Sequence, residues 1–320
     1  MTLLVVIVNY RTPDLAIDCL RSLEAEVGME PGTRVVVVDN ASGDGSAGRI
    51  AEAIRARDWG GWASVQPLGH NGGFAAGNNA AIRPARRSVE PLRYVLLLNP
   101  DTVVRPGALR ALVEFMETRP DVGIAGSRLE DLDGTPQRSA FRFPSVLGEI
   151  EGGMRLGLVT HILRRWVVAP PIPEHDGPTD WVSGASMIVR REVFDAIGSL
   201  DDGYFLYYEE VDFCLRARRA GWPSWYVPAS RVVHLVAQST GVSHASEARP
   251  RRPAYWFRAR RRYFLKNHGW AKTIAADLAW AASYASYRVR RVLQRKPDRD
   301  PESMLRDFIR HNLFPPAMGP

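Results

Sequence analysis

The sequence predicts an α/β protein with a mainly parallel central sheet flanked by helices, and three observations support this fold class. Short apolar and β-branched runs alternate with helical patterns over the first hundred residues, which is the order of βαβ units. The composition, 45% hydrophobic and 24% charged, excludes disordered, collagen-like and disulfide-stapled proteins. The length of 320 residues is enough for one large core and an appended segment.

Predicted strands and helices alternate through the first part of the chain. Unbroken apolar runs indicate strands that are covered on both faces, and they occupy Leu3–Val8, Val35–Val38 and Tyr94–Leu98. Apolar residues at helical spacing indicate helices over residues 13–26, 47–57 and 106–118. A proline begins the last of these helices. Its missing N–H breaks no hydrogen bond there, because the first N–H groups of a helix have no partner within the helix.

The middle of the chain is less regular. Residues 130–180 lose clear periodicity and contain six prolines, so we expect a long excursion over the sheet that covers a site. The elements predicted beyond it are a strand at 186–189, helices at 191–197 and 209–220, a last strand through Val232 and Val233, and a mostly helical tail over 254–293.

These elements divide the chain into two predicted parts. Residues 1–245 form the α/β domain, with halves at 1–128 and 129–245, and residues 246–320 form a helical C-terminal region. The two cysteines lie far apart in helix-like stretches, which favours reduced thiols in a cytoplasmic protein. The apolar run at the N-terminus is far shorter than the ~18 residues that a membrane span needs.

The net charge of +7 is unevenly distributed. Residues 249–299 carry 15 Lys and Arg against 2 Asp and Glu, whereas residues 1–248 carry 25 against 30. A basic segment on an acidic body suits nucleic acid, an anionic membrane surface or an acidic substrate, and composition alone does not choose between them.

The basic segment combines cations with aromatic residues. Arginines and a lysine alternate with aromatic rings over residues 255–266, and the apolar stretch at 270–287 is interrupted by Lys272 and Asp277. This pattern favours a helix that lies on a membrane over one that crosses it. A helical appendage packed on the rest of the protein is the alternative.

Polar residues follow three of the predicted strands. The strands end at Asn9-Tyr10, at Asp39-Asn40 and at Asn99-Pro100-Asp101. Because ligands of open α/β sheets collect beyond the carboxyl ends of the strands, these side chains are candidates for one binding site. Asn and Asp are also common in turns and caps, which explains each of them alone but explains three together less well.

A glycine-rich segment spans residues 71–79, in which Asn71, Gly73, Phe74 and Asn78 precede or begin an Ala-rich helical pattern. Glycines allow a ligand to approach the backbone, and amides at a helix N-terminus favour phosphate. The segment is neither the dinucleotide fingerprint, which follows the first strand directly, nor a P-loop, which ends in Gly-Lys-Ser/Thr. A plain turn is the alternative.

Two further places carry candidate chemistry. Asp101 comes just after a buried strand, where its carboxylate could bind a divalent cation that also binds phosphates. His234 lies at a strand end and is either a metal ligand or a histidine whose hydrogen bonds are made within the protein. The carboxylates of Glu209, Glu210 and Asp212 begin a helix directly after an aromatic run. Carboxylates at a helix N-terminus interact favourably with the helix dipole, which is one explanation for the cluster. Beside apolar residues, however, a carboxylate is partly desolvated, which raises its pKa and makes it suitable as a general base.

Taken in order, these motifs resemble bacterial family 2 glycosyltransferases, and among them the rhamnosyltransferase branch. The resemblance covers about residues 3–240. The motifs that carry it are Val8-Asn9-Tyr10, Val38-Asp39-Asn40 with Ser42 and Asp44, Asn71-x-Gly73-Phe74 to Asn79, Leu98-Asn99-Pro100-Asp101, Trp181-x-x-Gly184-Ala185, Tyr208-Glu209-Glu210-Val211-Asp212 and Val233-His234.

The resemblance implies a GT-A fold, a nucleotide-diphospho-sugar donor, Mg²⁺ or Mn²⁺, and inversion at the anomeric carbon. It implies that Glu210 is the base, that Asp101 and His234 bind the metal, and that Trp181, Glu209 and Asp212 support the acceptor or the base. The residues implied to bind the donor are Asn9, Tyr10, Asp39, Asn71, Gly73, Phe74, Asn78, Asn99 and Gly184. Asn99 stands where the family has the first acid of its Asp-x-Asp element, and Glu210 where it has an aspartate.

The sequence therefore predicts a glycosyltransferase that works at the cytoplasmic face of the cell membrane. We expect a lipid-linked or polysaccharide acceptor, an anionic membrane surface that meets residues 249–299, and no nucleic acid partner. The alternative is a non-catalytic protein of the same fold that binds a sugar nucleotide or nucleic acid. A sugar-phosphate nucleotidyltransferase is disfavoured, because Asn9 to Pro13 contains no Gly-rich loop with Arg and Lys.

Overall fold

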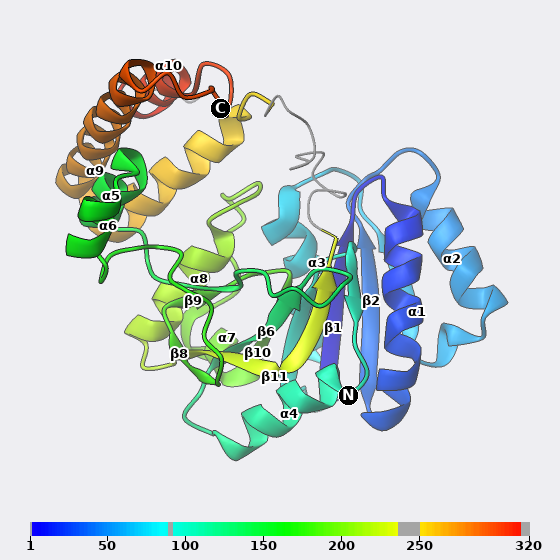
Figure 1. Cartoon of the computed structure of the whole chain (residues 1–320). Helices are drawn as coiled ribbons and strands as arrows, with labels where there is room; N and C mark the ends of the chain where they lie inside the picture. The colour runs from blue at the N-terminus through cyan, green and yellow to red at the C-terminus, as the bar shows by residue number, and fades with distance from the viewer. Residues whose placement is uncertain (1, 89–91, 236–249, 315–320) are drawn as a thin grey trace. The chain divides into compact units, whose positions relative to one another are not determined.

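The computed structural model describes residues 2–88, 92–235 and 250–314 (Figure 1). By internal packing the chain forms two units. The first, here called the sheet unit, comprises residues 2–141, 171–205 and 209–235. The second, here called the helical unit, comprises residues 142–170, 206–208 and 250–314.

A nine-stranded sheet forms the centre of the sheet unit, in the order β3-β2-β1-β4-β10-β6-β11-β5, with β8 paired to β11. Strands β1, β2, β3, β4, β6 and β11 run in one direction, which confirms the mainly parallel sheet. The strand bounds are β1 Leu3–Asn9, β2 Thr33–Asp39, β3 Ala63–Pro67, β4 Tyr94–Leu98, β5 Thr102–Val104, β6 Ile124–Glu130, β8 Gly177–Thr179, β10 Ser186–Arg190 and β11 Ser224–His234. A second, two-stranded sheet joins β7 (Ala140–Phe141) to β9 (Trp181–Val182).

Helices cover both faces of the central sheet. Helices α1, α2 and α4 share one apolar core with the inward side chains of the strands, such as Val5 and Ile7. Because side chains alternate along a strand, Val8 points to the opposite face, where Gly77 of α3 packs against it. The helix bounds are α1 Pro13–Met29, α2 Ser46–Ala56, α3 Gly73–Arg87, α4 Ala108–Thr118, α7 Arg191–Ile197 and α8 Glu209–Arg219.

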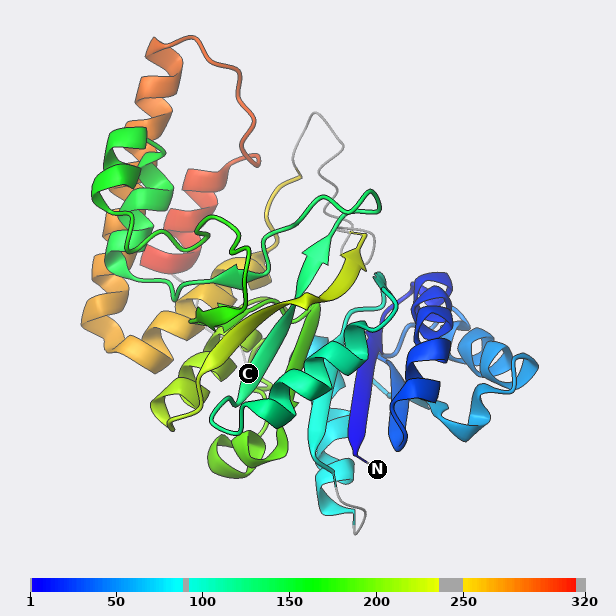
Figure 2. The ribbon, with the colours of Figure 1, turned by 60° about the horizontal axis from the view of Figure 1, so that its bottom comes forward.

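The helical unit contains the longest helix of the described residues, α9 (Ala254–Leu293). Gly269 has non-helical backbone angles and bends α9, as Figure 2 shows. The other elements are α5 Val146–Met154, α6 Gly157–Ile162, α10 Met304–Phe308 and a π-helical turn at Ile309–Leu313. In the part of the chain that the structure describes, every helix is too short or too polar to span a membrane.

The sequence located most of these elements within a few residues, and two regions differ. Part of the segment expected to be irregular, residues 130–180, is helical: it contains α5 and α6, and residues 142–170 pack within the helical unit. The last strand begins at Ser224, eight residues before Val232. A proline breaks its apolar pattern, and the strand accommodates it at a bulge between Val227 and Arg231.

Candidate active site

The carboxyl ends of β1, β2 and β4 lie side by side, because these strands are parallel and in register. Asn9 at the end of β1 is the register partner of Asp39 at the end of β2. Both side chains are almost fully buried. The predicted gathering of polar residues at one edge of the sheet is therefore confirmed.

Asp39 is held by a compact set of hydrogen bonds. Its Oδ1 accepts hydrogen bonds from Nδ2 of Asn9 at 2.7 Å and from the hydroxyl of Ser42 at 2.5 Å, and its Oδ2 accepts one from the backbone N–H of Ser42 at 3.2 Å. These donors fix the orientation of the carboxylate. The ring of Tyr10 is 38% exposed, and the guanidinium of Arg11 lies over it.

Asn40 connects the end of β2 to the glycine-rich segment. Its Nδ2 donates to Oδ1 of Asn71 at 2.8 Å and to the backbone oxygen of Gly73 at 3.0 Å. Gly73 has a φ of +85°, and a Cβ there would lie 2.0 Å from the backbone oxygen of Phe205. Only glycine fits this position, because both the backbone angle and the space exclude a side chain.

Helix α3 begins in this segment and is fixed at two points. The N–H of Phe74 donates to the backbone oxygen of Phe205 at 2.8 Å, and Nδ2 of Asn79 donates to the backbone oxygen of Leu200 at 2.9 Å. Asn78 is fully buried and donates to the backbone oxygen of Phe74. Among the described residues, Oδ1 of Asn78 has no hydrogen-bond partner.

Asp101 and His234 face each other across the loop after β4 and the end of β11. Oδ1 of Asp101 lies 3.5 Å from Nε2 of His234, and Nδ2 of Asn99 lies 3.4 Å from the same nitrogen. Two neighbouring ligands of one divalent cation lie roughly 3 Å apart, so the pair fits such an ion. In the described ranges, no group of three or more His, Cys, Asp and Glu that could hold a metal is found.

Glu210 lies in the first turn of α8, and its Oε2 is shielded from solvent. That oxygen has no hydrogen-bond partner among the residues described. Burial raises the pKa of Glu210 to about 7. A carboxyl with this pKa exchanges its proton near neutral pH, as a general base must.

The two other carboxylates of the cluster are buried, and Asp212 has a structural partner. Arg216 donates to Oδ2 of Asp212 at 2.8 Å, and the hydroxyl of Tyr204 donates to its Oδ1 at 3.4 Å. Glu209 is 3% exposed. The hydrogen bond from Tyr204 joins the start of α8, and with it Glu210, to the preceding segment.

Gly184 lies between Glu210 and the glycine-rich segment. A Cβ at this position would be 3.3 Å from the ring of Phe74 and 3.9 Å from Cβ of Glu210. Gly184 is therefore close both to the candidate base and to Phe74, which follows Gly73. Trp181 precedes Gly184 and begins β9, where its ring stacks on that of Phe141 with the centroids 4.2 Å apart.

Three residues of this region have no individual role in the sequence analysis. Asn40 is among the polar residues at the strand ends, but only the structure shows that it connects β2 to the glycine-rich segment. Phe205 acts through its backbone oxygen, so its side chain gave no signal. Phe141 meets Trp181 only because β7 pairs with β9, forty residues later in the chain.

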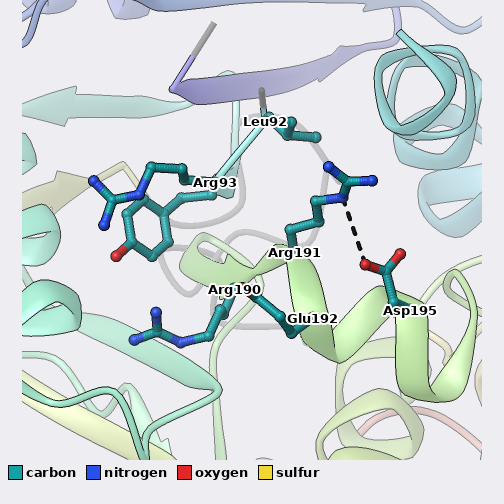
Figure 3. A pocket seen from close by; sticks show the side chains of 7 residues that line it. Leu92, Arg93, Arg190, Arg191, Glu192 and Asp195 are labelled. Atoms are coloured by element: carbon teal, nitrogen blue, oxygen red, sulfur yellow. Dashed lines mark ion pairs between the residues drawn. The ribbon is translucent and has the colours of Figure 1, made fainter. Parts of the chain in front are cut away.

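A cavity of about 250 Å³ lies at the opposite end of β4 (Figure 3). The three arginines that line it have partners: Arg93 pairs with Glu117, Arg191 faces Asp195, and Arg190 donates to three backbone oxygens. The residues that line the cavity are Leu92, Arg93, Tyr94, Arg190, Arg191, Glu192 and Asp195. None of the residues predicted for the site lines it, so the cavity is not the candidate active site.

The sequence matches, over residues 2–263, the family model described as Glycosyltransferase like family 2. It is similar to the N-acetylglucosaminyl-diphospho-decaprenol L-rhamnosyltransferase of Mycobacterium tuberculosis, with 32% identity over 257 residues, 77% of this chain and 78% of that protein. It is also similar to the rhamnosyltransferase WbbL of Escherichia coli, with 30% identity over 169 residues, 51% of this chain and 60% of that protein.

Among solved structures, the fold is similar to that of a mannosyltransferase of Pyrobaculum calidifontis in complex with GDP-Man and Mn²⁺. The TM-score is 0.56 at 14% identity, over 92% of this chain and 74% of that chain. At such low identity the similarity concerns the fold alone. The fold is the GT-A fold, as the sequence resemblance implied.

Proposed function

We propose that this chain, which belongs to glycosyltransferase family 2 and is a glycosyltransferase, transfers rhamnose from a nucleotide-diphospho-rhamnose to a lipid-linked sugar. The transfer inverts the configuration at the anomeric carbon. The observation that carries the proposal is the position of Glu210. A Cβ at Gly184 would lie 3.9 Å from Cβ of Glu210 and 3.3 Å from the ring of Phe74 in the glycine-rich segment, and Oε2 of Glu210 is shielded from solvent. Gly184 therefore lies close both to the residue proposed as the base and to the segment proposed to bind the donor.

The donor nucleotide is assigned to the edge formed by β1 and β2. A pyrimidine N3–H donates to Asp39, whose carboxylate Asn9 and Ser42 orient, and the ring of Tyr10 covers the nucleoside. Asn71, Gly73, Phe74 and Asn78 line the path of the diphosphate together with Asn99.

Transfer then requires one proton acceptor and one stabilised leaving group. Glu210 removes the proton of the acceptor hydroxyl as that oxygen attacks the anomeric carbon, opposite the departing diphosphate. A single displacement inverts the configuration. A divalent cation bound by Asp101 and His234 would neutralise charge on the leaving diphosphate. Asp212 holds the start of α8 through Tyr204, Glu209 supports the base from the neighbouring position, and Trp181 offers an apolar ring to the acceptor.

We expect dTDP-rhamnose and UDP-rhamnose, with Mg²⁺ or Mn²⁺, to raise the melting temperature by several degrees, and GDP-rhamnose to raise it much less. A donor at 100 times its Kd stabilises by about 2.7 kcal/mol, and a purine presents a different edge to Asp39. Thermal-shift titrations across this panel measure the effect, and transfer of labelled rhamnose to N-acetylglucosaminyl-diphospho-polyprenol tests the reaction.

Asp101→Asn and Asp101→Ala provide the controls for the cation. Both variants should keep most of the stabilisation by dTDP-rhamnose alone and lose the additional stabilisation by metal, because each removes the carboxylate charge. A metal effect that survives in both variants would place the cation elsewhere. Equal stabilisation by GDP-rhamnose would contradict the assignment of Asp39.

The lipid-linked acceptor implies an enzyme that works at a membrane surface, and α9 offers cations for this contact. Arg258, Arg262 and Lys266 are exposed and follow one another at four-residue spacing, which places them on one face of the first half of the helix. Other members of the basic-aromatic pattern have a different role. Arg260 and Tyr263 are buried within the helical unit, so they are part of its interior.

We expect the full chain to bind vesicles that contain phosphatidylglycerol at low salt, and the variant Arg258→Ser/Arg262→Ser/Lys266→Ser to bind at least about tenfold more weakly. Each basic residue near an anionic surface contributes about 1 kcal/mol, and salt screens the attraction. Vesicle sedimentation measures the binding. The control removes three arginines of the sheet unit, Arg55, Arg57 and Arg110, and should change binding little; equal losses would mean that only net charge matters.

A further inference from the structure

Residues 152–173 form an acid-free stretch that contains Arg155, Arg164 and Arg165. The stretch includes α6, and none of the residues of α6 is buried. The helix and its flanks nevertheless carry large apolar side chains. Leu158 is 67% exposed and Ile162 is 64% exposed.

This exposure is unusual for a water-facing helix. Four large apolar side chains are exposed within eleven residues, namely Leu156, Leu158, Ile162 and Trp166. Leu158 and Ile162 are four residues apart and therefore share one face of α6. An exposed apolar group of this kind marks a surface that meets another apolar phase.

The composition around α6 points to a lipid bilayer as that phase. Arg164 and Arg165 are exposed next to Trp166, and no carboxylate of the stretch opposes them. Aromatic rings and arginines beside apolar side chains are typical of segments that lie in the headgroup region, where the rings meet the acyl boundary and the arginines reach phosphates. Arg155 pairs with Asp300, and Glu151 accepts a hydrogen bond from Thr160 of α6, so the cations that complement an anionic leaflet are Arg164 and Arg165.

The place of the stretch in the chain adds a second argument. Residues 142–170 belong to the helical unit. They follow Phe141 of β7 directly, and the chain is again part of the sheet unit from Pro171, before Trp181 of β9. Phe141 and Trp181 are register partners, and their rings stack. The segment that bears α6 is therefore tied in sequence, at both of its ends, to the strand pair to which the acceptor is assigned.

We propose that residues 156–166 insert into the membrane surface and that this insertion delivers a membrane-embedded acceptor to the site. The inference rests on the proposed function for its acceptor, but the membrane contact itself does not. It differs from the electrostatic contact of α9, because Leu158 and Ile162 act through apolar burial. Salt should therefore weaken the contribution of α9 more than that of α6.

A kinetic experiment tests the delivery. Wild-type protein and the variant Leu158→Ser/Ile162→Ser are assayed with N-acetylglucosaminyl-diphospho-polyprenol in phosphatidylglycerol vesicles and with a short-chain, water-soluble analogue of the same acceptor. We expect kcat/KM on vesicles to fall at least about tenfold and kcat/KM on the soluble analogue to change less than about twofold. The control Met29→Ser/Leu132→Ser, with exposed apolar positions of the sheet unit, should leave both values unchanged.

A labelling experiment tests insertion without any transfer reaction. Both native cysteines are buried, so a cysteine placed by Leu158→Cys takes an environment-sensitive fluorophore selectively. We expect its emission to shift to the blue when phosphatidylglycerol vesicles are added, and the emission of the same probe at Met29→Cys to stay unchanged.

The outcomes distinguish membrane insertion of residues 156–166 from the proposed rhamnosyl transfer. Equal losses on both acceptors would mean that the substitutions disturb the fold, and an unshifted probe would mean that α6 does not enter the bilayer; either overturns the inference. A wild-type dimer in sedimentation velocity that Leu158→Ser/Ile162→Ser dissociates would assign the surface to a second copy and also overturn it. If no rhamnose donor supports transfer to the soluble analogue by wild type, the proposed function fails while the probe shift still tests insertion.

Discussion

Glu210→Gln is expected to lower kcat by about 10²–10⁴-fold while the affinity for the donor changes less than about twofold. The amide keeps the size of the side chain but cannot accept the proton of the attacking hydroxyl. Donor binding survives because the residues assigned to the nucleotide lie on β1, β2 and α3. Single-turnover transfer measures the rate, and thermal shift with dTDP-rhamnose measures binding in the same preparation.

The pH dependence of the wild type follows from the raised pKa of Glu210. The base is active when ionised, so kcat/KM should rise with pH, with an inflection near 7, and level off above it. Residual activity of Glu210→Gln should not show this inflection. Transfer by Glu210→Gln at the wild-type rate would assign the base to another residue.

Stability should change in the opposite direction from activity. A carboxyl with a pKa of about 7 in the folded state and about 4.5 in the unfolded state binds a proton more tightly when folded, so the free energy of unfolding falls as pH rises from 4.5 to 7. Glu210→Gln removes this loss and should be more stable than wild type at pH 8, by up to about 3 kcal/mol, and equally stable below pH 4. A variant that is less stable at pH 8 would show that the carboxylate is favourably paired.

The strands and the polar edge of the sheet were predictable because their signals are local. A buried parallel strand such as β4 is an unbroken apolar run, and the sequence located it at Tyr94–Leu98, as the structure has it. The turn residues after such runs face one another once the strands are parallel, which is how Asn9 and Asp39 meet. Neither step requires knowledge of distant contacts.

The remaining features of the site depend on contacts that no local pattern specifies. Gly73 requires glycine because the backbone of Phe205, far along the chain, passes next to it. Tyr207 and Tyr208 precede the carboxylate cluster with φ values of +73° and +68°. A bulky residue reaches this left-handed region only under constraint from its surroundings, so the sequence pattern gave no sign of it.

The tail shows the same limit for charged residues. A basic-aromatic pattern predicts an exposed surface, yet Arg260 is 1% exposed. Its Nη1 donates to Oδ1 of Asp277 at 2.5 Å and its Nη2 to Oε2 of Glu149 at 2.9 Å. The partners lie 17 residues after it and 111 residues before it. Spacing within α9 alone could not distinguish this arginine from its exposed neighbours.

Arg260→Met is therefore expected to lower the free energy of unfolding of the helical unit by about 3–5 kcal/mol. Methionine fills much of the space between the rings of Phe264 and Phe308, which flank the guanidinium, but it leaves two buried carboxylates without their main partner. Hydrogen exchange of the α5 and α9 amides measures the change within this unit, since a two-unit chain does not have one global transition. Arg258→Met, two residues away and exposed, is the matched control and should change stability by less than about 0.5 kcal/mol.

The pH dependence of this loss distinguishes a charge effect from a packing effect. Burial raises the pKa of Glu149 and of Asp277 even in the presence of Arg260, and removing the cation should raise both further. Carboxyls with raised folded-state pKa values destabilise the fold as pH rises through those values, so the deficit of Arg260→Met should be larger at pH 8 than at pH 5. A deficit that is the same at both pH values would attribute the loss to packing.

Neutralising the stranded carboxylates should then restore stability. The triple variant Arg260→Met/Glu149→Gln/Asp277→Asn removes the buried charges together, and replacing a whole buried ionic group is often neutral, whereas removing one partner is costly. We expect it to recover most of the lost stability at pH 8, while Glu149→Gln/Asp277→Asn alone, which leaves the arginine buried without a carboxylate, should be destabilised. If the triple variant is as unstable as Arg260→Met, the arginine stabilises the unit through its aliphatic stem and ring contacts, and the ion pairs contribute little.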